Sequence, residues 1–113
     1  MKRFEIWLVN LPKLENSHIQ CGSRPVVIVS NDAANANSPV ITVVPLTSQR
    51  HKLAMPTHVY LRGQGLERDS IALCEQVMAV DKHRLTRRIG SVHDPFDQLA
   101  VHHALAIQLD MTA

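Results

Sequence analysis

The sequence has little of what marks secreted, metal-binding or membrane-bound proteins. It contains two cysteines among 113 residues, and Cys21 and Cys74 follow no spacing typical of a metal or redox motif. No apolar run approaches the roughly 20 residues that a membrane-spanning helix needs, and the run at residues 6–9 is too short for a signal peptide. We therefore expect a cytoplasmic protein with reduced thiols, without a bound metal or cofactor and without membrane attachment.

Strong net charge is also missing. The formal charge of +2 permits an anionic partner but does not identify one. The basic residues are nevertheless unevenly placed, and five of them crowd one short stretch: Lys82, His83, Arg84, Arg87 and Arg88. We favour a solvated turn around a short helix for this stretch, with a patch that follows phosphates as the alternative.

What is present suits one small folded domain covering residues 1–113. Hydrophobic residues make up 45% of the chain and charged residues 19%, which is typical of a globular protein with one modest core. Apolar patterns and turn residues predict strands at residues 4–10, 24–30, 40–47, 57–61, 70–80 and 89–92. The connection at residues 11–23 is long, and loops of that length in small domains are often functional.

The C-terminal part changes to helical spacing. Asp94 followed by Pro95 predicts a helix start, and Asp97 adds the negative charge that suits a first turn. Apolar residues and one histidine then recur with helical periodicity: Phe96, Leu99, Ala100, His103, Ala104 and Ile107. Short strands followed by one helix predict a mainly β protein, a small closed or partly closed barrel with a C-terminal α-helix.

Two predicted strands have polar ends. One begins at Arg24 and Pro25, and the other ends at Thr47, Ser48 and Gln49. If these strands lie side by side and antiparallel, the guanidinium meets the hydroxyl groups. Such a pair suits an oxyanion, of which phosphate is the commonest.

The order and spacing of short segments along nearly the whole chain resemble the MazF/PemK toxins of bacterial toxin–antitoxin pairs. The matching segments are Glu5-Ile6-Trp7, Gly22-Ser23-Arg24-Pro25-Val26, Ser30-Asn31-Asp32, Pro45-Leu46-Thr47-Ser48, Pro56-Thr57-His58-Val59, Gly65-Leu66-Glu67-Arg68-Asp69-Ser70, Glu75-Gln76, Asp81-Lys82-His83-Arg84-Leu85 and Ile89-Gly90. The resemblance implies an SH3-like barrel of the CcdB/PemK/MazF type and a homodimer. It also implies a metal-independent endoribonuclease that cuts single-stranded RNA such as mRNA, and an antitoxin whose acidic C-terminal tail occupies the RNA groove.

Arg24 and Thr47 match the catalytic motif of that family. Metal-free RNA cleavage uses the 2′-hydroxyl of the substrate as nucleophile and gives a 2′,3′-cyclic phosphate and a 5′-hydroxyl. The protein must stabilise the phosphorane and move protons. Arg24 would neutralise the phosphate oxygens, and Thr47 would donate a hydrogen bond to them, with Ser48 assisting.

The resemblance offers two auxiliary candidates for proton transfer, and for each a structural role is an equal alternative. Glu75 stands where the family has an acidic residue, and His18 matches a histidine of the PemK branch. That branch also has an arginine where this chain has Leu73, and relatives commonly carry Arg-Thr where this chain has Met78 and Ala79. A further departure is the residue at position 4, a phenylalanine where glycine is usual.

Base recognition would rest on polar groups, because the chain has only four aromatic residues and most of them suit a core. The loops at residues 15–22 and 49–56 are the expected contacts, with Gln20 and Pro56 as candidates. Gln76 follows Glu75 on the same predicted strand, and its amide would read a base edge.

Three alternatives stay open at this point. Arg24 would have a purely structural role if it paired with Glu75. A CcdB-like toxin of the same fold would bind gyrase without cutting anything, although the C-terminal sequence of this chain lacks the tryptophan-glycine-isoleucine of that family. A catalytically weak relative would bind RNA or antitoxin without useful cleavage, and the changes at Met78 and Ala79 keep this alternative alive.

Overall fold

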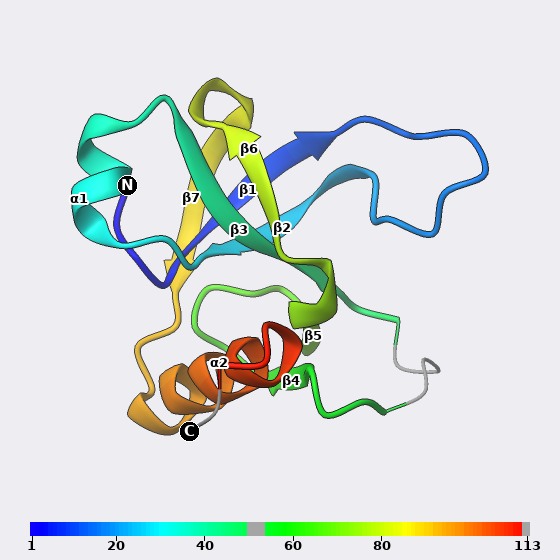
Figure 1. Ribbon diagram of the computed structural model, residues 1–113, viewed down its shortest axis with the longest axis vertical. Helices are drawn as coiled ribbons and strands as arrows, with labels where there is room; N and C mark the ends of the chain where they lie inside the picture. The colour runs from blue at the N-terminus through cyan, green and yellow to red at the C-terminus, as the bar shows by residue number, and fades with distance from the viewer. Residues whose placement is uncertain (50–53, 112–113) are drawn as a thin grey trace.

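The fold, seen in a computed structural model that describes residues 1–49 and 54–111, is a mainly β barrel-like domain with a C-terminal helix. The described residues form seven strands, two α-helices and two short 3-10 helices (Figure 1). In chain order these are β1 (Glu5–Leu11), β2 (Gly22–Ile28), α1 (Asp32–Asn37), β3 (Val40–Thr47), β4 (His58–Leu61), β5 (Ser70–Leu73), η1 (Cys74–Gln76), β6 (Met78–Asp81), η2 (Lys82–Arg84), β7 (Leu85–Ser91) and α2 (Pro95–Gln108). The predicted fold class is confirmed.

The strands pair antiparallel in the order β4-β5-β3-β2-β1-β7. The long strand β3 holds the two halves of the barrel together, because its first half pairs with β6 and its last residues pair with β5. In Figure 1, α2 lies beside β4 and η1 at one end of the molecule, while α1 lies near the N-terminus at the other. Among the described strands, β4 and β7 are the two ends of this order, so the barrel is partly closed.

Strands β2 and β3 are buried on both faces, as their continuous apolar runs predict. Val27 and Val44 belong to the core cluster that includes Val101 of α2. Their neighbours Val26 and Val43 belong to a second cluster on the opposite side. Successive side chains of a strand point to opposite faces, so a strand between two cores must be apolar at every position.

Residues 70–80 do not form the single strand that the apolar run predicts. The 3-10 helix η1 separates β5 from β6, and Glu75 and Gln76 lie on η1 rather than on a strand. The pattern misled because Cys74, on η1, is as buried as the strand residues before it. Periodicity cannot separate a buried turn from a buried strand within a short apolar run.

Strand β7 begins four residues before the predicted strand, at Leu85. The apolar pattern did not predict its first half, because Thr86, Arg87 and Arg88 are polar and exposed. As the last strand of the order, β7 pairs with β1 and with no other strand of the described residues, and charged residues are common on such edges. The short helix predicted after Asp81 is confirmed as η2, although the Asp81 side chain makes no capping bond.

Helix α2 starts as predicted, because the Asp94 carboxylate accepts a hydrogen bond from the Phe96 backbone N–H at 2.8 Å. Its inner face buries Val101 and Ala104. Phe96 and Leu99 are 83% and 65% exposed within this chain. Tyr60 of β4 is 58% exposed as well, so the expectation that most aromatic residues are core is wrong for Phe96 and for Tyr60. None of the described helices is both long enough and apolar enough to cross a membrane.

The unusual residue at position 4 occupies a strained backbone conformation. Phe4 has a φ of 71°, in the left-handed region that favours glycine. Its backbone N–H donates to the Ile28 carbonyl at 2.7 Å, and its carbonyl accepts from the Val92 N–H at 2.7 Å. These two bonds fix the conformation and give a physical reason why glycine suits this position.

Candidate functional site

The predicted meeting of two polar strand ends is confirmed. Strands β2 and β3 are antiparallel, with Val26 opposite Pro45 and Val27 opposite Val44. In such a ladder, each step back toward Arg24 on β2 corresponds to a step forward toward Thr47 on β3. Both residues line one groove of about 640 Å³.

The Arg24 guanidinium is held in place by acceptors on one side. Nε donates to the Cys21 carbonyl at 2.8 Å, and Nη1 donates to the Leu46 carbonyl at 3.3 Å. Nη1 also donates to Oε1 of Gln20. Within the described residues, no protein acceptor is found for Nη2 and no carboxylate pairs with Arg24, so the alternative of an Arg24–Glu75 ion pair is wrong.

Thr47 offers a hydroxyl group in the same groove. The residue is only 5% exposed, and Oγ1 accepts a hydrogen bond from the Gln49 backbone N–H at 3.2 Å. That contact does not use the hydroxyl proton, which can still be donated to an anion. Ser48 is exposed and lines the groove beside Thr47.

Further arginines make the groove positive. Arg68, Arg87 and Arg88 line it together with Arg24, and these four outnumber the single carboxylate among the described lining residues, that of Glu67. Arg88 Nε lies 3.4 Å from a carboxylate oxygen of Glu5. Burial raises the pKa of Glu5, but bonds from the Trp7 side chain and a backbone N–H, together with the Arg88 charge, bring it below its ordinary value.

The basic stretch at residues 82–88 therefore divides between two places. Its first three residues form η2, as the favoured interpretation of a short helix predicts, and Arg84 faces another groove. Arg87 and Arg88 belong to β7 and line the Arg24 groove, which agrees with the phosphate-following alternative. Sequence reasoning missed Arg68 as a groove residue, because nothing in its local pattern shows which surface it faces.

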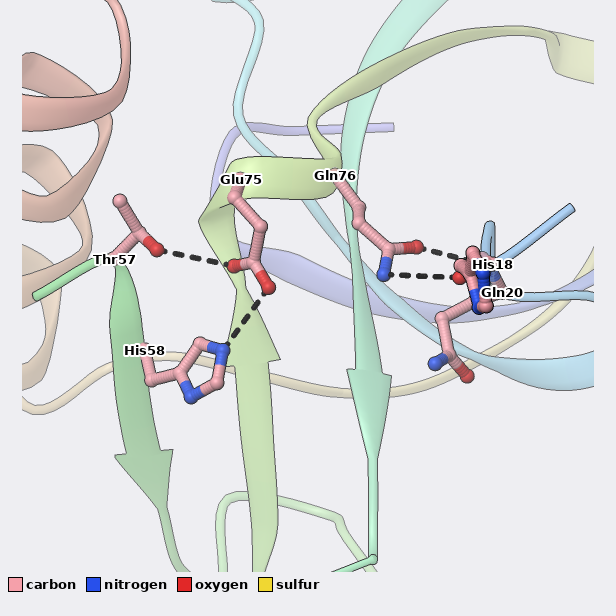
Figure 2. A network of polar contacts seen from close by, with 6 residues as sticks. All are labelled: His18, Gln20, Thr57, His58, Glu75 and Gln76. Carbon is pink, nitrogen blue, oxygen red and sulfur yellow. Dashed lines mark hydrogen bonds and ion pairs between the residues drawn. The ribbon is translucent and has the colours of Figure 1, made fainter. Parts of the chain in front are cut away.

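Glu75 lies in a different polar cluster, which Figure 2 shows. Its Oε1 accepts from the Thr57 hydroxyl at 3.1 Å, and its Oε2 lies 3.0 Å from His58 Nε2. The His58 side chain is 3% exposed and that of Glu75 is 22% exposed. Burial and the neighbouring Glu75 charge raise the pKa of the Cys74 thiol to about 12.

Two other predicted residues, His18 and Gln20, lie on the loop between β1 and β2, where Gln76 of η1 contacts them. The Gln76 amide accepts from the Gln20 backbone N–H at 2.9 Å and donates to the His18 carbonyl at 3.5 Å (Figure 2). His18 is exposed, and its imidazole makes no contact with Arg24 among the described residues. The amide of Gln76 therefore holds the loop in this conformation.

The structure thus brings Arg24, Thr47 and Ser48 into one groove, and Gln20 contacts Arg24 through its side chain. Gln20 itself lines a second groove of about 600 Å³ together with Glu75 and Gln76. Pro56 is exposed in the turn before β4 and lines neither groove. Of the loop predicted to contact RNA at residues 49–56, residues 50–53 lie outside the described residues.

The described part of the chain contains no cluster of side chains that could together hold a metal ion. Across residues 1–49 and 54–111, no group of three or more His, Cys, Asp or Glu side chains is placed to hold a metal ion. Both Cys21 and Cys74 are free thiols. The chemistry that the groove offers is a fixed guanidinium beside hydroxyl donors.

Comparison with known proteins shows the family of this chain. Residues 2–109 match the family model described as the PemK-like, MazF-like toxin of type II toxin–antitoxin systems. The chain is 38% identical to Endoribonuclease EndoA of Bacillus subtilis (strain 168) over 111 residues, which cover 96% of this chain and 94% of the relative. This match favours the MazF/PemK prediction over the CcdB-like alternative.

Solved structures share the fold. MazF from Deinococcus radiodurans (Form-I) superposes with a TM-score of 0.83 at 20% identity, over 98% of this chain and 97% of the other. An endoribonuclease in complex with its cognate antitoxin from a mycobacterial species superposes with a TM-score of 0.79 at 22% identity, over 100% and 98% of the two chains.

Proposed function

Because the chain belongs to the PemK-like, MazF-like family of type II toxin–antitoxin toxins, we propose that it is an endoribonuclease that cuts single-stranded RNA without a metal ion. The observation that carries this proposal is the Arg24 guanidinium. Its Nε and Nη1 are bound to the protein while Thr47 shares its groove. A guanidinium fixed in this way is preorganised for a phosphate group.

In the proposed reaction, the substrate 2′-oxygen attacks the adjacent phosphorus and the bond from phosphorus to the 5′-oxygen breaks. The products are a 2′,3′-cyclic phosphate and a 5′-hydroxyl. Arg24 and Thr47 stabilise the phosphorane oxygens, with Ser48 at the groove surface. Arg24 itself is no base, because a guanidinium has N–H donors and no acceptor.

Proton transfer is assigned to an auxiliary group. Glu75 is the weaker of the two candidates, because its carboxylate is bound by Thr57 and His58 and lines the second groove. His18 is exposed on the loop, two residues before Gln20, which touches Arg24. Exchange of each residue for alanine, followed over a range of pH, would show which one supplies the acidic limb of the rate profile, where the rate falls as the base takes up a proton.

The direct test is cleavage of a long RNA in the presence of EDTA. We expect cutting to continue, with 5′-hydroxyl and cyclic or 3′-phosphate ends. Arg24→Ala and Thr47→Ala should each lose at least about 10²-fold in rate while staying folded. Arg62→Ala is a matched control, because Arg62 is an exposed arginine whose Nε lies near Asp69, away from the groove. Dependence on added Mg²⁺, or normal cutting by Arg24→Ala, would refute the proposal.

We further propose regulation by an antitoxin with an acidic tail. A groove that offers Arg24 and three other arginines to RNA phosphates would equally accept carboxylates. The mycobacterial structure in complex with its cognate antitoxin supports this partner class by fold. Binding should weaken as salt rises, and Arg24→Glu should impair binding of both antitoxin and RNA. Simultaneous binding of both without mutual weakening would contradict a shared groove.

The protein would act as a homodimer in the cytoplasm, where its RNA substrate and reduced thiols belong. Support for the dimer comes from the outer face of α2, where Phe96 and Leu99 remain 83% and 65% exposed within one chain. Two-fold pairing would bury such a face. Light scattering at micromolar concentration should give twice the 12.6 kDa chain mass.

A further inference from the structure

Gln76 connects η1 to the loop between β1 and β2 at two points. Its Oε1 accepts from the Gln20 backbone N–H at 2.9 Å, and its Nε2 donates weakly to the His18 carbonyl at 3.5 Å. Figure 2 shows the Gln76 amide pointing directly at these two loop residues. Both functional groups of the amide are therefore used within the protein.

Gln20 continues this connection to the groove. While its backbone N–H is held by Gln76, its side-chain Oε1 accepts from Arg24 Nη1. The next loop residue, Cys21, accepts from Arg24 Nε at 2.8 Å through its carbonyl. The orientation of the guanidinium thus depends on where these two consecutive loop residues lie.

The other end of the connection is anchored in the barrel. Glu75, beside Gln76 on η1, binds Thr57 and His58 at the start of β4 through both carboxylate oxygens. The Cys74 backbone N–H donates to the Thr57 carbonyl at 3.0 Å, and the Cys74 side chain is fully buried. The element that carries Gln76 is therefore a rigid support for a loop that is otherwise exposed.

We propose that Gln76 is a positioning residue for Arg24, acting through Gln20, and that the Glu75 carboxylate serves to anchor η1. This inference rests on the proposed RNA cleavage at Arg24. Without the Gln76 amide, the loop has more conformations and Gln20 no longer fixes Nη1. The role replaces the base contact predicted for Gln76 from the sequence.

Kinetics on an RNA oligonucleotide that carries a mapped cleavage site would test the role. Gln76→Ala should lower kcat about 5- to 10-fold, the effect of losing one or two neutral hydrogen bonds, with KM changed less than about twofold because the loss acts on a transition-state contact. Gln76→Glu keeps an acceptor for the Gln20 N–H and should recover most of the rate. Gln98→Ala is the matched control, since it removes a side-chain amide of α2 that donates to the Val92 carbonyl at 2.8 Å.

A double-mutant cycle separates positioning from direct recognition. In an Arg24→Lys background, Gln76→Ala should cost almost nothing further, because the guanidinium that it orients is gone. If Gln76 reads a base instead, Gln76→Ala should raise KM and allow cleavage at a wider range of sequences. The loss of activity caused by Gln76→Ala would then also be seen in the Arg24→Lys background. That outcome would overturn the proposal.

A readout without RNA keeps the test independent of the activity. The Arg24 Nε–H group, bonded to Cys21, should give a resolved, slowly exchanging NMR signal in the wild-type protein. It should broaden or exchange faster in Gln76→Ala, but not in Gln98→Ala. An unchanged signal and an unchanged kcat in Gln76→Ala would refute positioning, whereas a wild-type protein that cuts no RNA would refute the proposed function alone.

Discussion

A methyl group added at Gly90 should disrupt the barrel where two backbone segments cross. A Cβ atom at Gly90 would lie 1.9 Å from the Gln64 carbonyl oxygen and 2.8 Å from the Gly65 Cα. Real Cβ atoms stay at least 3.0 Å from such atoms, so β7 and the loop before β5 would have to separate by about 1.1 Å. A Cβ at Gly65 would lie 2.2 Å from the Ile89 carbonyl oxygen, so neither segment has room for a side chain at this crossing.

Separating these segments would also break the contacts of Gln64. Its carbonyl accepts from the Ser91 N–H at 3.2 Å. Its side chain donates to Asp97 at 2.9 Å and accepts from the His93 N–H at 3.0 Å. Overpacking costs about 1–3 kcal/mol, and each lost hydrogen bond adds about 1 kcal/mol. We therefore expect Gly90→Ala to lower the free energy of unfolding by about 3 kcal/mol or more, a fall of about 15 °C in Tm.

Thermal unfolding followed by circular dichroism, at one fixed protein concentration, is the assay. Gly63→Ala is the matched control, because Gly63 has a φ of +61° but a Cβ there would meet nothing within 4 Å. It should cost only the backbone strain of about 1–2 kcal/mol. If Gly90→Ala lowers Tm no more than Gly63→Ala does, the close approach of β7 and the loop before β5 does not limit stability, and the prediction is wrong. Because Gly65 and Ile89 line the Arg24 groove, Gly90→Ala should also lose RNA cleavage.

Four other predictions follow from single features. Phe4→Gly should be about 1 kcal/mol more stable than Phe4→Ala in urea unfolding, because φ is 71° there; equal stabilities would contradict the strain. Iodoacetamide should modify Cys21 in the native protein, while Cys74, which is fully buried and has its pKa raised to about 12, should react only on unfolding. Mass spectrometry locates the modified cysteine, and modification of Cys74 in the native protein would contradict the prediction. Contacts in the folded protein lower the pKa of Glu5 below its ordinary value of 4.5, so the ionised carboxylate stabilises the fold above pH 4.5 and this stabilisation is lost as the pH falls. The difference in free energy of unfolding between the wild-type protein and Glu5→Gln should therefore shrink in acid, and a difference that does not change with pH would contradict the prediction. Leu99→Glu, at a residue 65% exposed in one chain, should give a monomer by light scattering; an unchanged dimer would place the interface elsewhere.

Much of the fold was predictable because it depends on local pattern. The range of β3 (Val40–Thr47) agrees with its apolar run and polar end. The start of α2 follows from Asp94 and Pro95, because capping uses groups within one helical turn. Family membership was equally readable, since it rests on the order of short segments along the chain.

The site was predictable only in part. The sequence suggested that Arg24 and Thr47 meet, and the structure places both in one groove, because antiparallel pairing of two predicted strand ends leaves little choice. The sequence placed Gln76 on a strand with its amide free for RNA. Which partner a side-chain amide binds depends on residues more than fifty positions away, and no local pattern carries that information.

The sequence by itself therefore determined most of the strand segments, where α2 begins and which residues end two paired strands, since these follow from hydrophobic period, capping groups and strand polarity. The tertiary structure alone decided that Cys74 turns the chain at η1, that Glu75 binds His58 rather than Arg24, and that Gln76 holds the loop beside Arg24. The physical reason is that each of these outcomes is a contact between distant segments. Such a contact depends on which groups the folded chain brings within hydrogen-bond distance, and the local pattern does not encode that.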